Sequence, residues 1–155
     1  MNEYKELEKV LNEYVGLLSR LEGVPAPKVE IHDIPEISDV FYYKNKIIYT
    51  TGELFGRGAI QLNPIHEFGH HVASIRGITN GEEIAEKILN KYEYNPEVVE
   101  FYEKHVHPVF IKAQKVLLNE LETRGIIPKS WLEFSPEERE KFEMELYRKR
   151  GDQNE

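Results

Sequence analysis

The sequence of 155 residues contains no cysteine. This absence excludes a disulfide framework, a thiolate zinc site and a cysteine nucleophile, so any metal must be held by histidine and carboxylate side chains. Long apolar runs are absent too, because none approaches the ~18 residues that a membrane span requires. Residues 1–6 carry no basic region followed by an apolar run, so no signal peptide is expected. We therefore expect a cytoplasmic protein with no membrane association.

Positive charge is in deficit as well, because the formal net charge is −8 at pH 7. This balance argues against bulk attraction to nucleic acid or to anionic lipid. The hydrophobic content of 40% and the charged content of 31% are typical of a soluble globular protein. The length suits a single domain over residues 1–155. Abundant Glu, Lys, Ile and Tyr without Cys indicate a thermophilic source.

The most informative stretch is His66-Glu67-Phe68-Gly69-His70, which follows the pattern H-E-x-x-H. Residues four apart on an α-helix lie one turn above each other, so His66 and His70 can offer imidazole nitrogens to one metal ion. Glu67 lies ~100° further round the helix, where a carboxylate can take a proton from metal-bound water. The alternative is a chance match on an amphipathic helix.

The residues around this motif predict a helix with both ends marked. Asn63 and Pro64 suggest an N-cap followed by proline at the first helical position, and Gly77 is expected to end the helix. His71 points away from the two histidines, and we expect it to be partly exposed rather than a ligand. The apolar residues expected on the opposite face are Ile65, Phe68, Val72 and Ile75.

The chain before the motif is predicted to form a helix and a small sheet. Residues 3–22 have the apolar spacing of an amphipathic helix. Residues 28–32 alternate as a half-buried strand with His32 on its surface face, and residues 40–43 and 46–50 flank a hairpin turn. Residues 59–62 are predicted to form a last strand leading into the metal-site helix. At a sheet edge that strand could pair with an extended peptide, and an ordinary covered strand is the alternative.

The chain after Gly77 is predicted to be helical. Asn80 is expected to cap a second helix, and Asn95 with Pro96 to start a third. Pro108 is expected to kink or break that helix, with a helical pattern resuming to residue 125 and a final charged helix from Ser135. The fold class is therefore α+β: an N-terminal helix, a small twisted mixed sheet of about three or four strands, the metal-site helix and further helices.

A catalytic zinc ion needs three protein ligands and an open position for water. The second helix begins with two candidate carboxylates, Glu82 and Glu86, and it follows the metal-site helix so closely that the two should pack side by side. If the two helices are antiparallel, the rise along their axes brings Glu86 closer than Glu82 to the height of His70. Helix phase favours Glu82 as the third ligand, because Glu82 borders the apolar face beside Leu89. We prefer Glu82, with Glu86 as the alternative.

The sequence H-E-x-x-H followed by E-x-x-A on the next helix resembles the gluzincin metallopeptidases, a zincin-like fold with a glutamate helix. It looks most similar to the minimal archaeal minigluzincins and to the peptidase domain of ImmA/IrrE-type proteins. The resemblance implies that His66, His70 and Glu82 bind zinc and that Glu67 is the general base and acid. It implies a catalytic core over about residues 28–92, with C-terminal helices over 95–150 outside it.

The leading hypothesis is therefore a zinc metalloendopeptidase that hydrolyses peptide or protein substrates through a zinc-bound water, with Glu67 moving the proton. Residues 95–150 add more helix than a minimal catalytic unit requires, so an autoinhibited enzyme is a related hypothesis. The resemblance to minigluzincins, which are latent, implies the same. The alternative is a catalytically silent or regulatory protein, a structural or interaction module with the same metal-binding site. Candidate donors to an oxyanion are His105, His107, Tyr92, Tyr94 and Tyr102. For each of them, a surface histidine or core tyrosine is the alternative.

Overall fold

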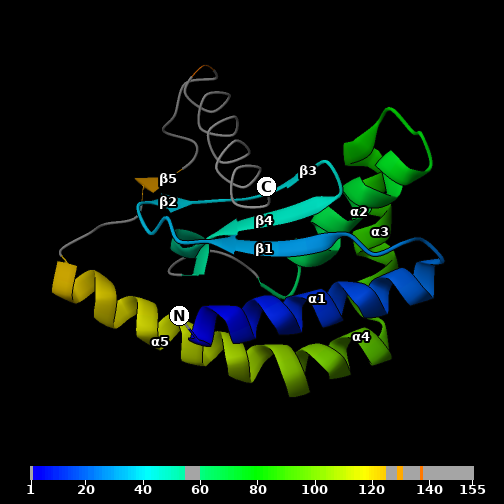
Figure 1. Ribbon diagram of the computed structural model, residues 1–155. Coiled ribbons are helices and arrows are strands. Elements are labelled where there is room, and N and C mark those ends of the chain that lie inside the picture. Colours follow the sequence, from blue (N-terminus) through cyan, green and yellow to red (C-terminus); the bar gives the residue numbers. More distant parts are fainter. Residues whose placement is uncertain (1, 55–59, 125–128, 131–136, 138–155) are drawn as a thin grey trace.

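The computed structural model describes residues 2–54, 60–124, 129–130 and 137. A long amphipathic helix, α1 (Asn2–Glu22), lies between the sheet and the helices α4 (Pro96–Phe101) and α5 (His107–Arg124) (Figure 1). Most of its apolar residues are buried, as the helical spacing predicted, although Leu21 near its end is exposed. No helix among the described residues is long and apolar enough to cross a membrane.

The sheet has three strands in the order β1-β4-β3: β1 (Lys28–His32), β3 (Val40–Tyr43) and β4 (Lys46–Thr50). Strand β4 is parallel to β1 and antiparallel to β3, which confirms the predicted small mixed sheet. The hairpin turn has φ angles of 45° at Lys44 and 67° at Asn45, and two positive values are what a two-residue type I′ turn requires. A second, unpredicted pair joins β2 (Ile37–Ser38) to β5 (Lys129–Ser130) in parallel.

Two expectations about this region are wrong. Residues 60–62 form a turn and not the end of a strand, and residue 59 lies outside the described residues. The Tyr14 hydroxyl donates to the Gln61 carbonyl over 3.0 Å, which fixes the turn against α1. His32 is half-buried and not a surface residue, because its Nε2 lies 3.3 Å from the fully buried Glu30 carboxylate.

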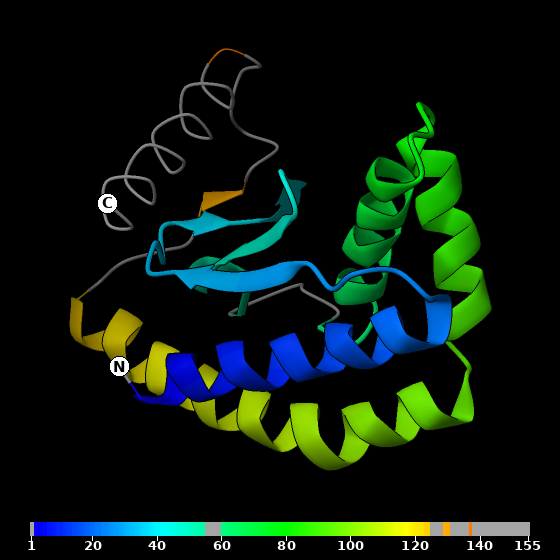
Figure 2. The same cartoon turned by 45° about the vertical axis from the view of Figure 1, so that its right-hand side comes forward.

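The helices α2 (Asn63–Ile75) and α3 (Gly81–Tyr92) contribute buried residues to the same core as α1 and the sheet, and Figure 2 shows them side by side beyond the end of the sheet. Gly77 has a φ of 68° at the end of α2, and the Asn80 side chain caps α3, both as predicted. Asn63 is already helical and makes no cap hydrogen bond, so the predicted N-cap is wrong although Pro64 lies in the first turn. Ile75 is exposed and does not join the buried apolar face of α2.

Pro108 does not break the C-terminal helix. A π-helical turn, Tyr102–Val106, joins α4 to α5, and the His107 amide donates to the Tyr102 carbonyl five residues earlier. Proline supplies no amide hydrogen, so a local change of hydrogen-bond register accommodates it without ending the helix. The helix predicted from Ser135 lies outside the described residues.

Glycine at position 69 sets the separation of α2 and α3. A Cβ atom at this position would lie 2.4 Å from the Ala85 Cα and 3.1 Å from the Ala85 Cβ, closer than packed carbon atoms can approach. The two helices therefore touch through the smallest side chains available. Because Glu82 lies one turn before Ala85 on α3, this contact also decides how near Glu82 comes to α2.

The close contact predicts the effect of adding one methyl group. In Gly69→Ala, the helices must separate, and we expect the free energy of unfolding to fall by about 1–3 kcal/mol. Gly16→Ala is the matched control, because nothing lies within 4 Å of a Cβ there and alanine favours a helix; we expect a gain of about 0.5–1 kcal/mol. Chemical denaturation measures both, and equal stabilisation by the two substitutions would contradict the contact.

Glu22, at the end of α1, joins α1 to the end of α2 and to α3. Its carboxylate lies 2.8 Å from Arg76 and 2.8 Å from Lys91, and the Tyr92 hydroxyl donates to it over 2.6 Å. The Glu22 side chain is almost fully buried, whereas the two cations are partly exposed. Burial alone would raise the pKa of Glu22, but the hydrogen bonds from Lys91, Tyr92 and Arg76 outweigh burial and lower the pKa below its usual 4.5.

A lowered pKa in the folded state means that Glu22 stabilises the protein above pH 4.5 and that this contribution is lost as the pH falls below that value. We expect Glu22→Gln to lower the free energy of unfolding by about 2 kcal/mol at pH 7, since its cationic partners are partly screened. The difference from the parent should shrink in acid, which denaturation at several pH values will measure. The control Glu83→Gln alters an exposed pair with Lys87 and should change stability by under ~0.5 kcal/mol. A difference in stability between Glu22→Gln and the parent that does not change with pH would contradict the lowered pKa of Glu22.

Candidate metal centre

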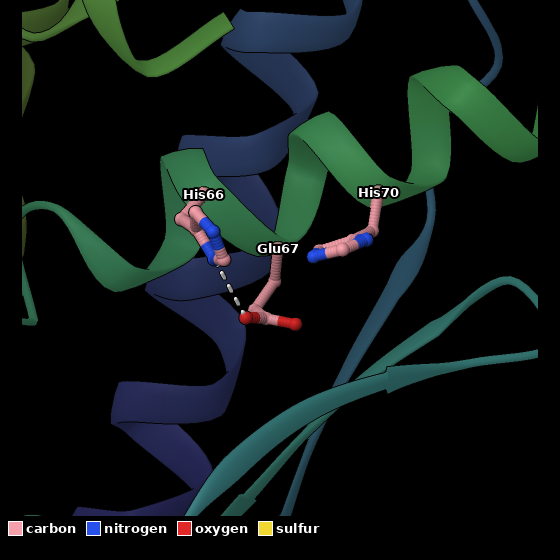
Figure 3. Close-up of side chains that lie close together, drawn as sticks. All are labelled: His66, Glu67 and His70. Carbon is pink, nitrogen blue, oxygen red and sulfur yellow. Dashed lines mark hydrogen bonds and ion pairs between the residues drawn. The ribbon is translucent and has the colours of Figure 1, made fainter. Parts of the chain in front are cut away.

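His66, Glu67 and His70 project from one side of α2, and Figure 3 shows the Glu67 carboxylate between the two imidazole rings. The ring centroids lie 5.1 Å apart. The opposite side of α2 carries Ile65, Phe68 and Val72, all fully buried, and this apolar anchoring holds the motif helix against the core. The two histidines are half-buried, so the motif lies at the edge of the core and in reach of solvent.

Glu82 of α3 reaches both histidines. One of its carboxylate oxygens lies 2.8 Å from the His70 Nε2 and the other lies 3.4 Å from the His66 Nε2. Donor atoms ~2.0–2.1 Å from a tetrahedral zinc ion lie roughly 3.3 Å apart, so the contact of Glu82 with each histidine has about the spacing of two ligands on one ion. Two imidazoles and one carboxylate are also a donor set that zinc accepts.

Glu86 lies near this group but in a different relation to it. Donor atoms of His66, Glu82 and Glu86 all lie within 4.8 Å of one another, as do those of His66, Glu67 and His70. Among the described residues, only Glu82 pairs with both histidines. Its side chain is 71% exposed, which leaves the centre open to solvent on the α3 side.

Two glycines make this arrangement possible, and the sequence analysis missed both. Gly69 lets α3 approach α2, and a Cβ at Gly81 would lie 2.9 Å from the His70 Nδ1. A larger residue at either position would therefore displace Glu82 or the His70 ring. The available signal was the placement of Gly69 within a predicted helix, where glycine carries a helix-propensity cost.

The two nitrogens of His66 face different carboxylates. Its Nδ1 lies 3.1 Å from the Glu67 Oε2, while its Nε2 faces Glu82. The hydrogen bond to Glu67 raises the pKa of His66 the most; burial opposes the increase and the charge of Glu82 adds to it. When Nδ1 carries the proton and donates to Glu67, a neutral ring presents the Nε2 lone pair on the side of Glu82.

His71 was expected to be partly exposed, and this expectation is wrong. The side chain is 1% exposed and its Nε2 donates to the Pro25 carbonyl over 2.7 Å, while its Nδ1 lies 3.0 Å from the Tyr42 hydroxyl. Burial lowers the pKa of His71, with the Pro25 hydrogen bond acting in the opposite direction. His71 therefore connects α2 to β3 and to the loop after α1, and it is not a ligand candidate.

The candidate oxyanion donors do not gather at this centre. The Tyr92 hydroxyl donates to Glu22, Tyr94 is 82% exposed, and the Tyr102 hydroxyl lies 3.4 Å from His107. His105 packs on Phe101 in a separate groove of about 270 Å³ between α1 and α4. Within the described part of the chain, none of these five residues makes a hydrogen bond or ion pair with His66, Glu67 or His70.

The geometry thus brings together four of the residues that the sequence singled out, His66, Glu67, His70 and Glu82, with Glu86 beside them. Comparison of the chain with protein-family models, with curated proteins and with solved structures finds no match.

Proposed function

We propose that this protein is a zinc-dependent metalloendopeptidase with a zincin-like fold, in which His66, His70 and Glu82 hold the metal. The observation that carries the proposal is the meeting of the Glu82 carboxylate with the Nε2 atoms of both histidines, beside the buried Glu67. Peptides or proteins are proposed as the substrate because the H-E-x-x-H helix followed by a glutamate helix resembles the gluzincins.

Zinc held by these donors would supply Lewis acidity, which lowers the pKa of a water molecule and polarises a carbonyl group. Glu67 accepts a proton from the attacking water and then donates it to the leaving amine nitrogen. The hydrogen bond between Glu67 and the His66 Nδ1 orients the carboxylate for both transfers. Because Glu67 is largely shielded from solvent, its charge acts in a surrounding of lower dielectric constant than bulk water.

The ligand assignment predicts which glutamate controls metal content. Glu82→Ala should lose stoichiometric zinc, because two histidines alone leave the donor set incomplete. Glu83→Ala is the matched control, since Glu83 is the next residue along α3, is exposed, and pairs with Lys87 and Asn80 instead of the histidines. Elemental analysis of protein purified without chelator will decide. Zinc retained in Glu82→Ala but lost in Glu86→Ala would reverse the assignment.

The role of Glu67 predicts a different result. Glu67→Ala should keep zinc, because Glu67 is not a ligand, and should lower kcat on unfolded protein substrates by about 10²–10⁴-fold. Glu83→Ala should again behave as the parent. Turnover by Glu67→Ala at the parent's rate would show that Glu67 is not the base. A zinc-loaded parent without turnover would fit both an autoinhibited enzyme and a silent metal-binding protein, and removal of the chain from Ser135 onward separates them, because a gain of turnover supports autoinhibition.

A further inference from the structure

His71 follows the candidate ligand His70 directly on α2, yet it points into the core. Its side chain is 1% exposed, and its ring centroid lies 6.1 Å from that of Phe68 on the same helix. A buried imidazole destabilises the folded state unless its nitrogens are hydrogen-bonded. Both nitrogens of His71 have partners, Pro25 on one side and Tyr42 on the other.

The partners of the His71 ring assign its proton. A carbonyl group can only accept, so the Nε2 atom that lies 2.7 Å from the Pro25 carbonyl carries the hydrogen. Burial lowers the pKa of His71, which leaves the ring neutral at pH 7 and makes Nδ1 an acceptor. The Tyr42 hydroxyl therefore donates to Nδ1 over 3.0 Å, and it accepts the Asn45 amide hydrogen over 3.1 Å. The Asn45 Oδ1 also lies 3.2 Å from this hydroxyl, but that contact is exposed and water can replace it.

These hydrogen bonds form one directed chain across four segments. It runs from the hairpin turn at Asn45, through Tyr42 on β3 and His71 on α2, to Pro25 in the loop after α1. The Tyr42 and His71 rings also meet edge to face, with their centroids 5.6 Å apart. The motif helix is thus held on two sides by polar contacts to the sheet and to the loop.

Directional contacts matter here because apolar packing alone does not fix how far a helix is rotated about its axis. The hydrophobic effect is non-directional, whereas a hydrogen bond weakens steeply when it is misaligned. A rotation of ~10° moves an atom ~6 Å from the helix axis by about 1 Å. Functional sites require donor positions within about 0.5 Å. A ring fixed at both nitrogens therefore sets the direction in which His70, ~100° further round α2, presents its imidazole.

We propose that Tyr42 is a positioning residue of the metal centre: its hydrogen bond to His71 fixes the rotation of α2 and so keeps His70 in reach of Glu82. The His70 Nε2 lies 2.8 Å from the Glu82 carboxylate, a contact that a small rotation of α2 would lengthen. The chain of hydrogen bonds stands on its own geometry. Its consequence for zinc rests on the proposed function, in which these residues hold the metal.

Zinc affinity separates positioning from simple support of the fold. Tyr42→Phe should raise the Kd for zinc about 3–10-fold, less than the loss of a direct partner of a ligand. The matched control is Tyr92→Phe, which removes a hydroxyl bound to Glu22 at the opposite end of α3 from Glu82. It should lower Tm but leave the Kd unchanged. Competition with a chelator of known affinity measures both, and an unchanged Kd in Tyr42→Phe would overturn the proposal.

A double-mutant cycle on the Kd then shows whether Tyr42 acts through His71. In a His71→Phe background, Tyr42→Phe should cause no further change in Kd. Equal changes in both backgrounds would mean that Tyr42 acts by another route, which also overturns the proposal.

Should His71→Phe fail to fold, nitrogen NMR of the histidine-labelled parent and of Tyr42→Phe decides. We expect a protonated Nε2 and a bare Nδ1 at His71, with the Nδ1 resonance shifted in Tyr42→Phe. The reverse tautomer, or an unshifted resonance, would contradict the chain of hydrogen bonds.

This readout keeps the inference distinct from the proposed function. A zinc-binding parent whose Kd does not respond to Tyr42→Phe overturns the inference alone. Absence of turnover in the parent counts against peptidase activity alone, because zinc affinity is what is measured. A parent that binds no zinc overturns the metal centre itself, and the positioning role of Tyr42 with it.

Discussion

The approach of α2 to α3 at Gly69 and Ala85 is the constraint on which the candidate centre depends. A Cβ at position 69 would lie 2.4 Å from the Ala85 Cα, so the helix separation is fixed by the lack of a side chain. That separation brings the Glu82 carboxylate to both imidazoles, with Gly81 leaving room for the His70 ring. The three candidate ligands, His66, His70 and Glu82, are thus placed by residues with little or no side chain, and packing geometry decides which donor groups can meet.

Local signals made most of the fold predictable. The helix over residues 2–22 follows from apolar periodicity, and the hairpin at Lys44 and Asn45 and the cap at Asn80 follow from short-range turn and cap chemistry. The errors fall where distant residues decide. Residues 60–62 form a turn whose Gln61 carbonyl accepts a hydrogen bond from the Tyr14 hydroxyl. The pairing of β2 with β5 joins segments about 90 positions apart, which local periodicity does not encode.

The candidate centre divides in the same way. His66, Glu67 and His70 lie on one helix, so their spacing alone placed them together. Helix rise and helix phase disagreed about Glu82 and Glu86, and the contacts follow the phase argument, because the side of α3 that faces α2 matters more than the height along its axis. The prediction that His71 is partly exposed was wrong because the residues that contact it, Tyr42 and Pro25, are remote in sequence.

His66 is the residue through which these features act together. Its Nδ1 faces Glu67 on its own helix and its Nε2 faces Glu82 on the next. Because the two ring nitrogens are chemically coupled, a proton held at Nδ1 by Glu67 leaves the other nitrogen free to act as a ligand. The same ring can therefore bind a metal and orient a base at once. In the proposed metal centre, the H-E-x-x-H sequence thus supplies a ligand whose tautomer is set by the neighbouring glutamate, and the Gly69 contact brings in the carboxylate proposed to complete the donor set.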